Sequence, residues 1–354
     1  MTASTMQGAG AVCPTPSVER ERVLLGHGSG GKLSAALIRD HILPHFTSDV
    51  LRELGDAAVV PTAGSELAIS TDSFVVNPLE FPGGDIGVLA VHGTINDLAM
   101  MGAEPRYITV SFIIEEGLEL ATLDRIVASM ARSAAQAGVA IVAGDTKVVE
   151  RGKADGLFVT TTGIGMFDGD FRAGPTRARA GDVVIVSGPI GAHGMTIMST
   201  REGLGFEAEL VSDTAALHPL VRRLREATAG QVHVMRDPTR GGVASALNEI
   251  AAASQVGIEL DEESIPVDGP VYAACEILGL DPLYVANEGI FIAMVPDGAA
   301  DEALEALRSH SLGTRACRIG RVTSANPGTV WLRTAIGGSR VIDMLPGDQL
   351  PRIC

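Results

Sequence analysis

The sequence predicts an α/β (α+β) protein of two domains with a flexible C-terminal tail. At 354 residues, of which 46% are hydrophobic, the chain is long enough for two cores. Apolar runs typical of strands alternate with amphipathic helical patterns, and this alternation begins again after the turn-forming residues 173–176. We therefore expect domains at 23–172 and 173–344, a disordered extension at 1–22 and a mobile tail at 345–354.

Composition excludes several classes of protein. With 27 basic and 43 acidic residues the net charge is −16, which argues against nonspecific binding to nucleic acid or to anionic membranes. No apolar run is long enough to span a membrane, and the N-terminus lacks the pattern of a signal peptide. The four cysteines form no metal-binding spacing, so reduced thiols in a cytoplasmic protein are the expected state.

A glycine-rich loop opens the first domain, where residues 26–32 read Gly-His-Gly-Ser-Gly-Gly-Lys. Glycines let backbone N–H groups converge on an anion, and a following helix adds its dipole. The spacing is close to a P-loop, but Leu33 stands where a metal-binding Ser or Thr is required. A Walker-type loop, a flexible flap over phosphates and a purely structural loop all remain open. The candidate nucleotide-binding residues here are His27, Gly28, Ser29, Gly30, Gly31 and Lys32.

Acidic residues follow where apolar elements break. Asp56 stands at the mouth of one predicted strand, Asp72 ends the next, and Asn96-Asp97 interrupts an apolar helix. A single aspartate is commonly a helix cap or a turn residue. Three of them at the ends of elements instead suggest oxygen ligands for Mg²⁺, and an Asn-Asp pair is costly to bury unless it binds something.

The first domain is expected to close with a helix and two strands. Residues 118–138 have the periodicity of an amphipathic helix, and the strand predicted at 139–142 leads into Gly144-Asp145-Thr146-Lys147. Lys147 has apolar neighbours, so it either extends its amine from a sheet edge into water or contacts a phosphate, and both readings stay open.

Two stretches of the second domain carry candidate chemistry. Asp237-Pro238-Thr239-Arg240-Gly241-Gly242 precedes a predicted helix, which makes either an anion-binding helix start or an ordinary cap. Asn287-Glu288-Gly289 interrupts an apolar run, 283–292, that reads as a strand. In such surroundings Glu288 needs a raised pKa or a lysine partner, which makes it a candidate acid or base; a solvated edge glutamate is the alternative.

The tail ends in a cysteine. Its prolines and glycine exclude a regular helix or ladder strand, and ten extended residues could reach about 30 Å, enough to fold back into a cleft of the same chain. Arg352 should favour the Cys354 thiolate, whereas the terminal carboxylate opposes it. A frayed terminus that happens to end in cysteine is the plainer interpretation.

Together these stretches resemble the HypE family of hydrogenase maturation factors, within the ATP-binding superfamily of aminoimidazole ribonucleotide (AIR) synthetase and selenophosphate synthetase. The Cys-terminated tail distinguishes HypE from the rest of that superfamily. Relatives often carry a second acid where this chain has Ala57. The matching residues are His27-Gly28-Ser29-Gly30-Gly31-Lys32, Asp56, Asp72, Asn96-Asp97, Gly144-Asp145-Thr146-Lys147, Asp237-Pro238-Thr239-Arg240-Gly241-Gly242, Asn287-Glu288-Gly289 and Pro351-Arg352-Ile353-Cys354.

The resemblance implies an AIR-synthetase-like fold, with mixed sheets flanked by helices, and a homodimer formed by the first domain. It implies that the carbamoyltransferase HypF loads a carbamoyl group onto the sulfur of Cys354. ATP then drives dehydration to a thiocyanate, whose cyanide passes to iron on the HypC–HypD complex for [NiFe] hydrogenase. On this reading Lys147 and Glu288 are catalytic, with Glu288 paired to Lys147 as the base. The further expected ligands of ATP are Asn96, Asp145, Thr239 and Arg240, and those of Mg²⁺ are Asp56, Asp72, Asp97 and Asp237.

Two other functions compete with this one. A small-molecule synthetase of the same superfamily would act on a free substrate, and the terminal cysteine would be incidental. A non-catalytic, nucleotide-gated scaffold would bind ATP without consuming it.

Overall fold

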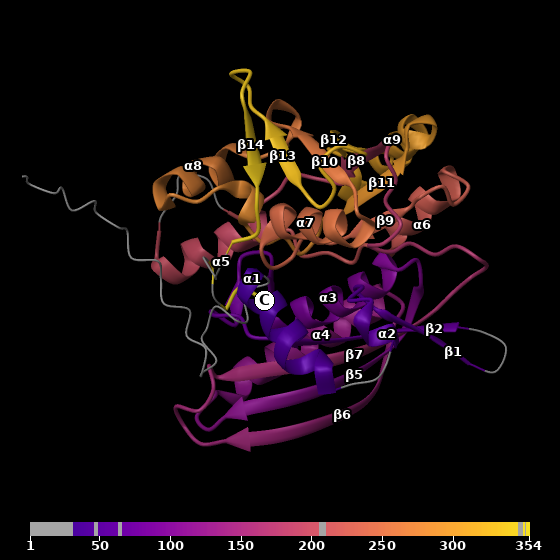
Figure 1. The fold of residues 1–354 in the computed structure, drawn as a ribbon. Coiled ribbons are helices and arrows are strands. Elements are labelled where there is room, and N and C mark those ends of the chain that lie inside the picture. The colour runs from indigo at the N-terminus through magenta and orange to yellow at the C-terminus, as the bar shows by residue number, and fades with distance from the viewer. Residues whose placement is uncertain (1–30, 46–48, 63–65, 205–209, 346–349, 351) are drawn as a thin grey trace, which may run out of the picture.

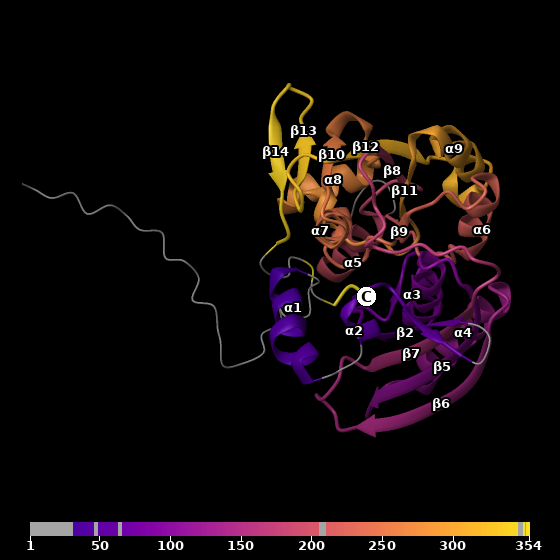
Figure 2. The ribbon, with the colours of Figure 1, turned by 45° about the vertical axis from the view of Figure 1, so that its right-hand side comes forward.

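The computed structural model describes residues 31–45, 49–62, 66–204, 210–345, 350 and 352–354. The predicted extension at 1–22 and the loop residues His27, Gly28, Ser29 and Gly30 lie outside the described residues. Two sheets with their helices stack one above the other, and the C-terminus lies between them (Figures 1 and 2). The predicted α/β fold with mixed sheets is confirmed.

The first sheet has the strand order β1-β2-β7-β5-β6. Its pairs are antiparallel except β5 with β6, which are parallel. Alternate residues of β7 are buried, which is the pattern of a sheet covered on one face. The elements of this part are α1 (Lys32–Leu37), α2 (Asp49–Arg52), β1 (Ala58–Pro61), β2 (Glu66–Phe74), a small hairpin of β3 (Glu80–Phe81) and β4 (Gly84–Asp85), α3 (Ile86–Met100), β5 (Glu104–Glu115), α4 (Leu120–Gln136), β6 (Ala140–Val149) and β7 (Leu157–Met166).

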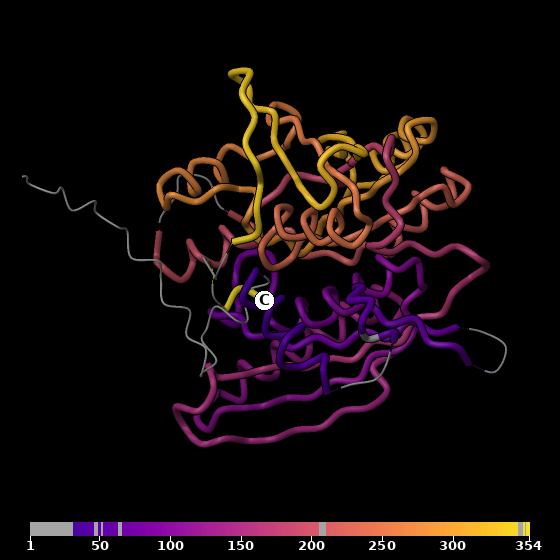
Figure 3. Tube along the Cα trace, in the orientation of Figure 1, coloured from indigo at the N-terminus to yellow at the C-terminus, as the bar shows by residue number. Residues whose placement is uncertain are grey.

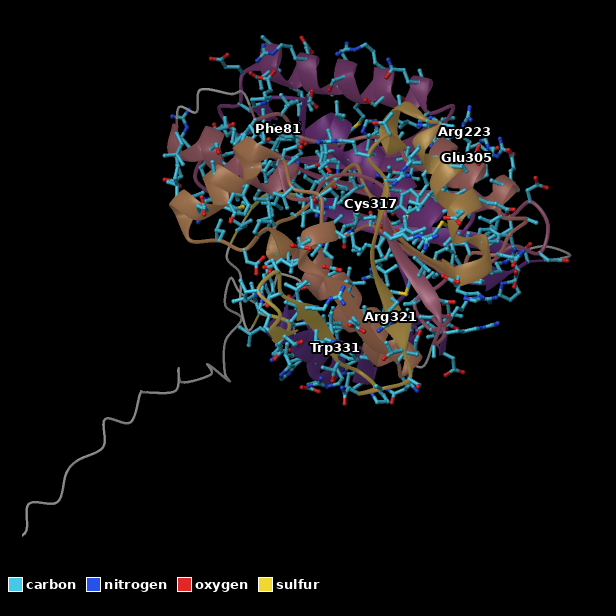
Figure 4. The ribbon with its side chains drawn as sticks, turned by 90° about the horizontal axis from the view of Figure 1, so that it is seen from above. Phe81, Arg223, Glu305, Cys317, Arg321 and Trp331 are labelled. Carbon is cyan, nitrogen blue, oxygen red and sulfur yellow. The ribbon has the colours of Figure 1, made fainter. Side chains whose placement is uncertain are left out.

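The second sheet has the order β14-β13-β10-β12-β8-β11-β9, and β10 with β13 is its parallel pair. Helices α6 and α9 lie beside each other against one face of this sheet, and Arg223 and Glu305 line a shallow groove between them (Figure 4). The elements are β8 (Asp182–Val186), α5 (Ala192–Glu202), α6 (His218–Ala227), β9 (Val234–Arg236), α7 (Gly242–Ser254), β10 (Gly257–Asp261), α8 (Gly269–Leu278), β11 (Ile292–Pro296), α9 (Ala300–Arg308), β12 (Cys317–Thr323), β13 (Val330–Arg333) and β14 (Ser339–Ile342), with a π-helical turn at Ile38–Ile42 and 3-10 turns at Leu43–His45, Glu262–Ser264, Pro282–Tyr284, Asp297–Ala299 and Ser311–Gly313.

Helix α3 joins the two halves. Most of its residues are buried all the way round, as expected of a helix with protein on every side. It contacts β2, β5, β7 and α4 of the first sheet and its helices, and α6 and β9 of the second. Residues carried by α3 therefore lie where the two halves meet.

Two predicted elements are wrong. Strand β6 does not end before the Gly144–Lys147 stretch but continues through it, and it is an exposed edge strand rather than a buried one. The run 283–292 is not one strand: a 3-10 turn and an irregular segment precede β11, which begins at Ile292. Both errors arise because short apolar runs look alike whether they are edge strands, core strands or packed loops.

The end of the tail is packed, whereas the sequence suggested a mobile arm. Leu350 and Ile353 are buried in the same hydrophobic cluster as Leu89 of α3. The backbone N–H of Val75 donates to the carbonyl of Cys354, and that of Asn77 donates to the carbonyl of Arg352, each at 3.2 Å. Figure 3 shows the end of the trace lying inside the molecule, beside α1 and α3. Leu350 and Arg352–Cys354 thus dock along the end of β2.

Within the part of the chain that the structure describes, no helix combines the length and the apolar character needed to cross a membrane.

Deleting residues 351–354 should leave the protein folded but lower its Tm by several degrees. Full burial of one Ile side chain contributes about 1.5–3 kcal/mol, and Ile353 is lost in this truncation. Differential scanning calorimetry measures the shift, with Cys354→Ser as a control that keeps the buried Ile353. An unchanged Tm would show that the tail does not stay docked in solution.

Candidate active site

Both halves of the protein and the tail enclose one small cavity. It lies at the end of β2, against α3, the loop after β9 and the loop before β11. Cys354 of the docked tail forms part of its wall, and the cavity volume of about 50 Å³ is far below the ~300 Å³ of small ligand pockets. The cavity is lined by Asp72, Ser73, Phe74, Gly93, Asp97, Asp237, Thr239, Arg240, Glu288 and Cys354.

Three carboxylates from distant parts of the chain meet beside this cavity. Asp56 precedes β1, Asp97 lies on α3 and Asp237 follows β9, and one oxygen of each lies within 4.8 Å of the others. Burial, followed by the charges of neighbouring groups, raises the pKa of Asp56 to about 8 and that of Asp97 well above its usual range. Burial likewise raises the pKa of Asp237 to about 6.

This donor set fits a divalent cation. Asp56 Oδ2 is buried and has no hydrogen-bond partner among the described residues. Mg²⁺ prefers hard oxygen ligands such as carboxylates. A bound cation would offset the burial and the mutual repulsion that raise the pKa values of these groups. Asp72 is not one of the three, but it lines the cavity and its charge contributes to the raised pKa of Asp97 and Asp237.

A buried arginine that sequence reasoning missed supports the three carboxylates. Arg236 Nη1 lies 2.9 Å from Asp56 Oδ1, and Nη2 of the same guanidinium donates to Glu249 on α7. Arg236 ends the short strand β9, directly before Asp237. Its only signal in the sequence is a charged residue at the end of an apolar run. It supplies one fixed positive charge among several buried acids.

The thiol of Cys354 reaches the opposite side of the cavity. It is hydrogen-bonded to the carboxyl group of Glu288, and burial raises its pKa well above the ordinary value while Arg240 opposes the shift. The expectation that Arg352 favours the Cys354 thiolate is wrong, because the Arg352 guanidinium lies 2.7 Å from Asp155 instead. Arg240 is thus the cation near the thiol, and the docked sulfur is a neutral thiol rather than a thiolate.

The surroundings of Glu288 also favour its protonated form. Burial, and then the charges of Asp237 and Asp213, raise its pKa well above the usual range, while Arg240 lowers it. Its Oε1 atom has no hydrogen-bond partner in the described chain. The expectation of a buried glutamate with a raised pKa is therefore met, and the alternative of a solvated edge residue is wrong.

The loop of Glu288 is held by its backbone. The carboxylate of Asp213 accepts hydrogen bonds from the N–H of Glu288 and from that of Gly289, at 3.2 and 3.0 Å. Asn287 accepts from the N–H of Gly191 at 2.6 Å and donates to the carbonyl of Pro238 at 2.9 Å. A Cβ at Gly289 would stand 1.6 Å from the Asp213 carbonyl oxygen, so only glycine fits there. Asp213 carries no motif and was missed.

Other predicted residues lie elsewhere. Lys147 and Asp145 are exposed on β6 and pair with each other at 3.5 Å, so the expected pairing of Lys147 with Glu288 is wrong within one chain. Both side-chain groups of Asn96 are taken by the backbone, the amide by the carbonyl of Ala215 and the oxygen by the N–H of Leu217. Lys32 begins α1 and pairs with Asp343. Contacts of these residues with a nucleotide remain predictions, as does one for Gly31, which directly precedes α1.

Comparison with known proteins places the chain in a family. The family described as "AIR synthase related protein, N-terminal domain" matches residues 54–167, and its C-terminal counterpart matches residues 179–333. Carbamoyl dehydratase HypE of Cupriavidus necator is 52% identical over 96% of each chain. A solved HypE–HypF complex contains a chain 46% identical, with a TM-score of 0.82, covering 88% of this chain and all of that one. HypE solved in complex with ATP is 50% identical, with a TM-score of 0.79, covering 94% of this chain and all of that one. The chain belongs to the HypE family of carbamoyl dehydratases.

Proposed function

We propose that this protein uses ATP to dehydrate a thiocarboxamide carried on the sulfur of Cys354. The product is a thiocyanate, which supplies the cyanide ligand for the iron of [NiFe] hydrogenase. The observation that carries the proposal is the position of Cys354, whose half-buried thiol lies beside Glu288 and Arg240 in the cavity next to the three carboxylates. A substrate attached to the chain reaches the site at a high effective concentration.

The chemistry requires the loss of one oxygen and two protons from an –S–CO–NH₂ group. ATP, when bound, supplies the phosphoryl group that turns the amide oxygen into a leaving group. Glu288 is placed to take a nitrogen proton, because its carboxyl group already contacts the sulfur to which that group is attached. It must first lose its own proton, and the charge of Arg240 favours that loss. Arg240 also faces the negative charge that develops on the departing oxygen.

We assign Mg²⁺ to Asp56, Asp97 and Asp237, with Asp72 as a further ligand. Mg²⁺, when bound, neutralises charge on the triphosphate. Thr239 and Arg240 line the cavity and are the nucleotide contacts best supported by position. Asp145 and Lys147 would join them only from a second chain, because both lie out on β6.

We also propose that the protein is a homodimer joined along β6. Nine of the ten residues of this strand are exposed, among them Ile141 (40%), Val142 (56%) and Val148 (68%). No strand of the described chain pairs with its outer edge. An exposed edge that carries several large apolar side chains invites another strand, and a second copy would cover it.

HypF is proposed as the enzyme that loads Cys354, and HypC–HypD as the acceptor of the cyanide. The solved HypE–HypF complex, with a chain 46% identical, supports the first of these. Since docked Cys354 is half-buried and lines a cavity of only about 50 Å³, the tail must leave the cavity to meet either partner. A cytoplasmic location agrees with the free thiols of Cys275, Cys317 and Cys354.

Cys354→Ala should abolish the product while nucleotide binding persists, because only the site of loading is removed. Mass spectrometry of the C-terminal peptide, after incubation with HypF, carbamoyl phosphate and ATP, follows a carbamoyl adduct that then loses one water. Cys317→Ala, which removes a partly exposed thiol elsewhere, is the matched control. ATP consumption with no adduct on Cys354 would favour a synthetase that acts on a free substrate. ATP binding without consumption would favour a non-catalytic scaffold.

Mg²⁺ should raise the Tm by several degrees at pH 8 and by much less at pH 6. In the metal-free protein the pKa of Asp56 is about 8, against about 3.9 in an unfolded chain. The folded state therefore holds more protons than the unfolded state across this window, and its stability falls as pH rises. A cation must displace those protons, so it binds better at pH 8. Asp97→Asn should remove most of the Mg²⁺ effect and Asp124→Asn, on the outside of α4, should not; equal Tm gains at both pH values would contradict the assignment.

Val148→Glu should convert the dimer to a monomer, because it places a charge on the strand proposed to form the interface. Light scattering coupled to size-exclusion chromatography measures the mass. Ile277→Glu on α8 is the control, since Ile277 is 67% exposed, close to the 68% of Val148, but lies far from β6 in the chain. A Val148→Glu protein that stays dimeric would place the interface elsewhere.

A further inference from the structure

The docked tail is held by polar contacts to its backbone as well as to the side chains of Arg352 and Cys354. Nε2 of His193 lies 2.6 Å from the carbonyl oxygen of Ile353. The carbonyl of Arg352 accepts from the Arg201 guanidinium at 2.6 Å as well as from the backbone N–H of Asn77. His193 is the only fully buried polar side chain among these partners, and its contact is adjacent to the reactive Cys354.

The chemistry of the partners fixes the proton positions on His193. A carbonyl oxygen can only accept, so Nε2 must donate, and Nδ1 of the neutral ring must accept. The hydroxyl of Ser212, 2.7 Å from Nδ1, is the donor, and the same hydroxyl accepts from the N–H of Thr214 at 3.2 Å. Burial lowers the pKa of His193 to about 4, so the ring stays neutral at neutral pH. Phe81 packs edge-on against the ring, with centroids 5.6 Å apart (Phe81 is labelled in Figure 4).

The segment that Ser212 belongs to also holds the candidate base. Asp213, the next residue, accepts the backbone N–H groups of Glu288 and Gly289. A chain of contacts therefore runs from the carbonyl of Ile353 through His193 to Ser212. The backbone then joins Ser212 to Asp213, whose carboxylate accepts the N–H groups of Glu288 and Gly289. Both ends of this chain converge on the thiol of Cys354.

We propose that His193 is a positioning residue that fixes the docked tail and the Glu288 loop in one mutual geometry. It touches neither the sulfur nor the carboxyl group of Glu288, and acts through Ile353 on one side and Ser212 on the other. The inference rests on the proposed function, because it takes Cys354 as the loaded residue. The docking part of it can be measured without ATP or partner proteins.

Two substitutions separate the two contacts of the ring. In His193→Asn the side-chain amide can replace Nδ1 but does not reach Ile353, whereas in His193→Gln the longer amide can replace Nε2 as the donor to the tail. Docking is read from the alkylation rate of Cys354 by iodoacetamide in the full-length protein, quantified on the C-terminal peptide. The docked thiol is half-buried and its pKa is raised, so it reacts more slowly than a thiol on an undocked tail. We expect His193→Asn to raise this rate about tenfold and His193→Gln to change it by less than about threefold.

Cys275 gives an internal control in the same samples, because it is fully buried in the core and reacts only on wider unfolding. An increase for Cys354 with Cys275 unchanged supports the proposal. A parallel increase of both thiols, or no increase in His193→Asn, would overturn it.

Single-turnover dehydration of loaded protein tests the second half of the chain. His193→Asn should slow the step and His193→Gln should recover part of it. Ser212→Ala should slow dehydration while leaving Cys354 alkylation near the wild-type rate. An unchanged dehydration rate in Ser212→Ala would show that Ser212 does not couple His193 to the Glu288 loop. If no variant, and not even the wild type, dehydrates the loaded tail, the proposed function fails, whereas the alkylation result still decides whether His193 holds the tail.

Discussion

The concentration of buried acid at one point is the constraint on which the rest of the structure depends. Asp56, Asp97 and Asp237 come from three separate elements, and Arg236 alone does not balance them. Burying like charges together is costly unless protons or a cation compensate, so the site exists in two chemically different forms. Helix α3 explains how the chain sustains this: it is buried on every side and holds Asp97 at the junction of both halves.

The tail brings a half-buried thiol, a group of low polarity, to the same site. Cys354 arrives as a neutral thiol between Glu288 and Arg240, although a thiolate is what a carbamoyl acceptor needs. The need for a thiolate and the neutral docked thiol are compatible if the cysteine occupies two environments in turn. In solvent, away from the carboxylates, the thiol ionises more readily and can be loaded. In the cavity, the uncharged thiocarboxamide fits a site that disfavours a thiolate. In the proposed cycle, the position of the tail separates loading from dehydration.

Much of this site could be predicted from the sequence. The residues that could not be predicted were missed for one common reason. Asp56, Asp97 and Asp237 stood out because acids at the ends of apolar runs are unusual, and Glu288 because its neighbours are apolar. Arg236, Asp213 and His193 carry no motif; their roles come from contacts between segments far apart in the chain. Strand β6 was misjudged because an apolar edge that another subunit could cover has the same composition as a core strand. The packing of Ile353 could not be predicted. The prolines of the tail exclude a regular helix or strand, but they do not indicate which part of the protein the tail packs against.

The cavity of about 50 Å³ left beside the tail has a kinetic consequence. When the substrate is part of the polypeptide, its concentration cannot be varied, so the dehydration step has no Michaelis constant for it and follows first-order decay of the loaded chain. Each loading yields one cyanide, and the stoichiometry of ATP consumed is tied to loading events and not to the time that enzyme and ATP spend together. A site closed by its own substrate also leaves little room for water, which limits idle hydrolysis of the nucleotide and of the reactive product.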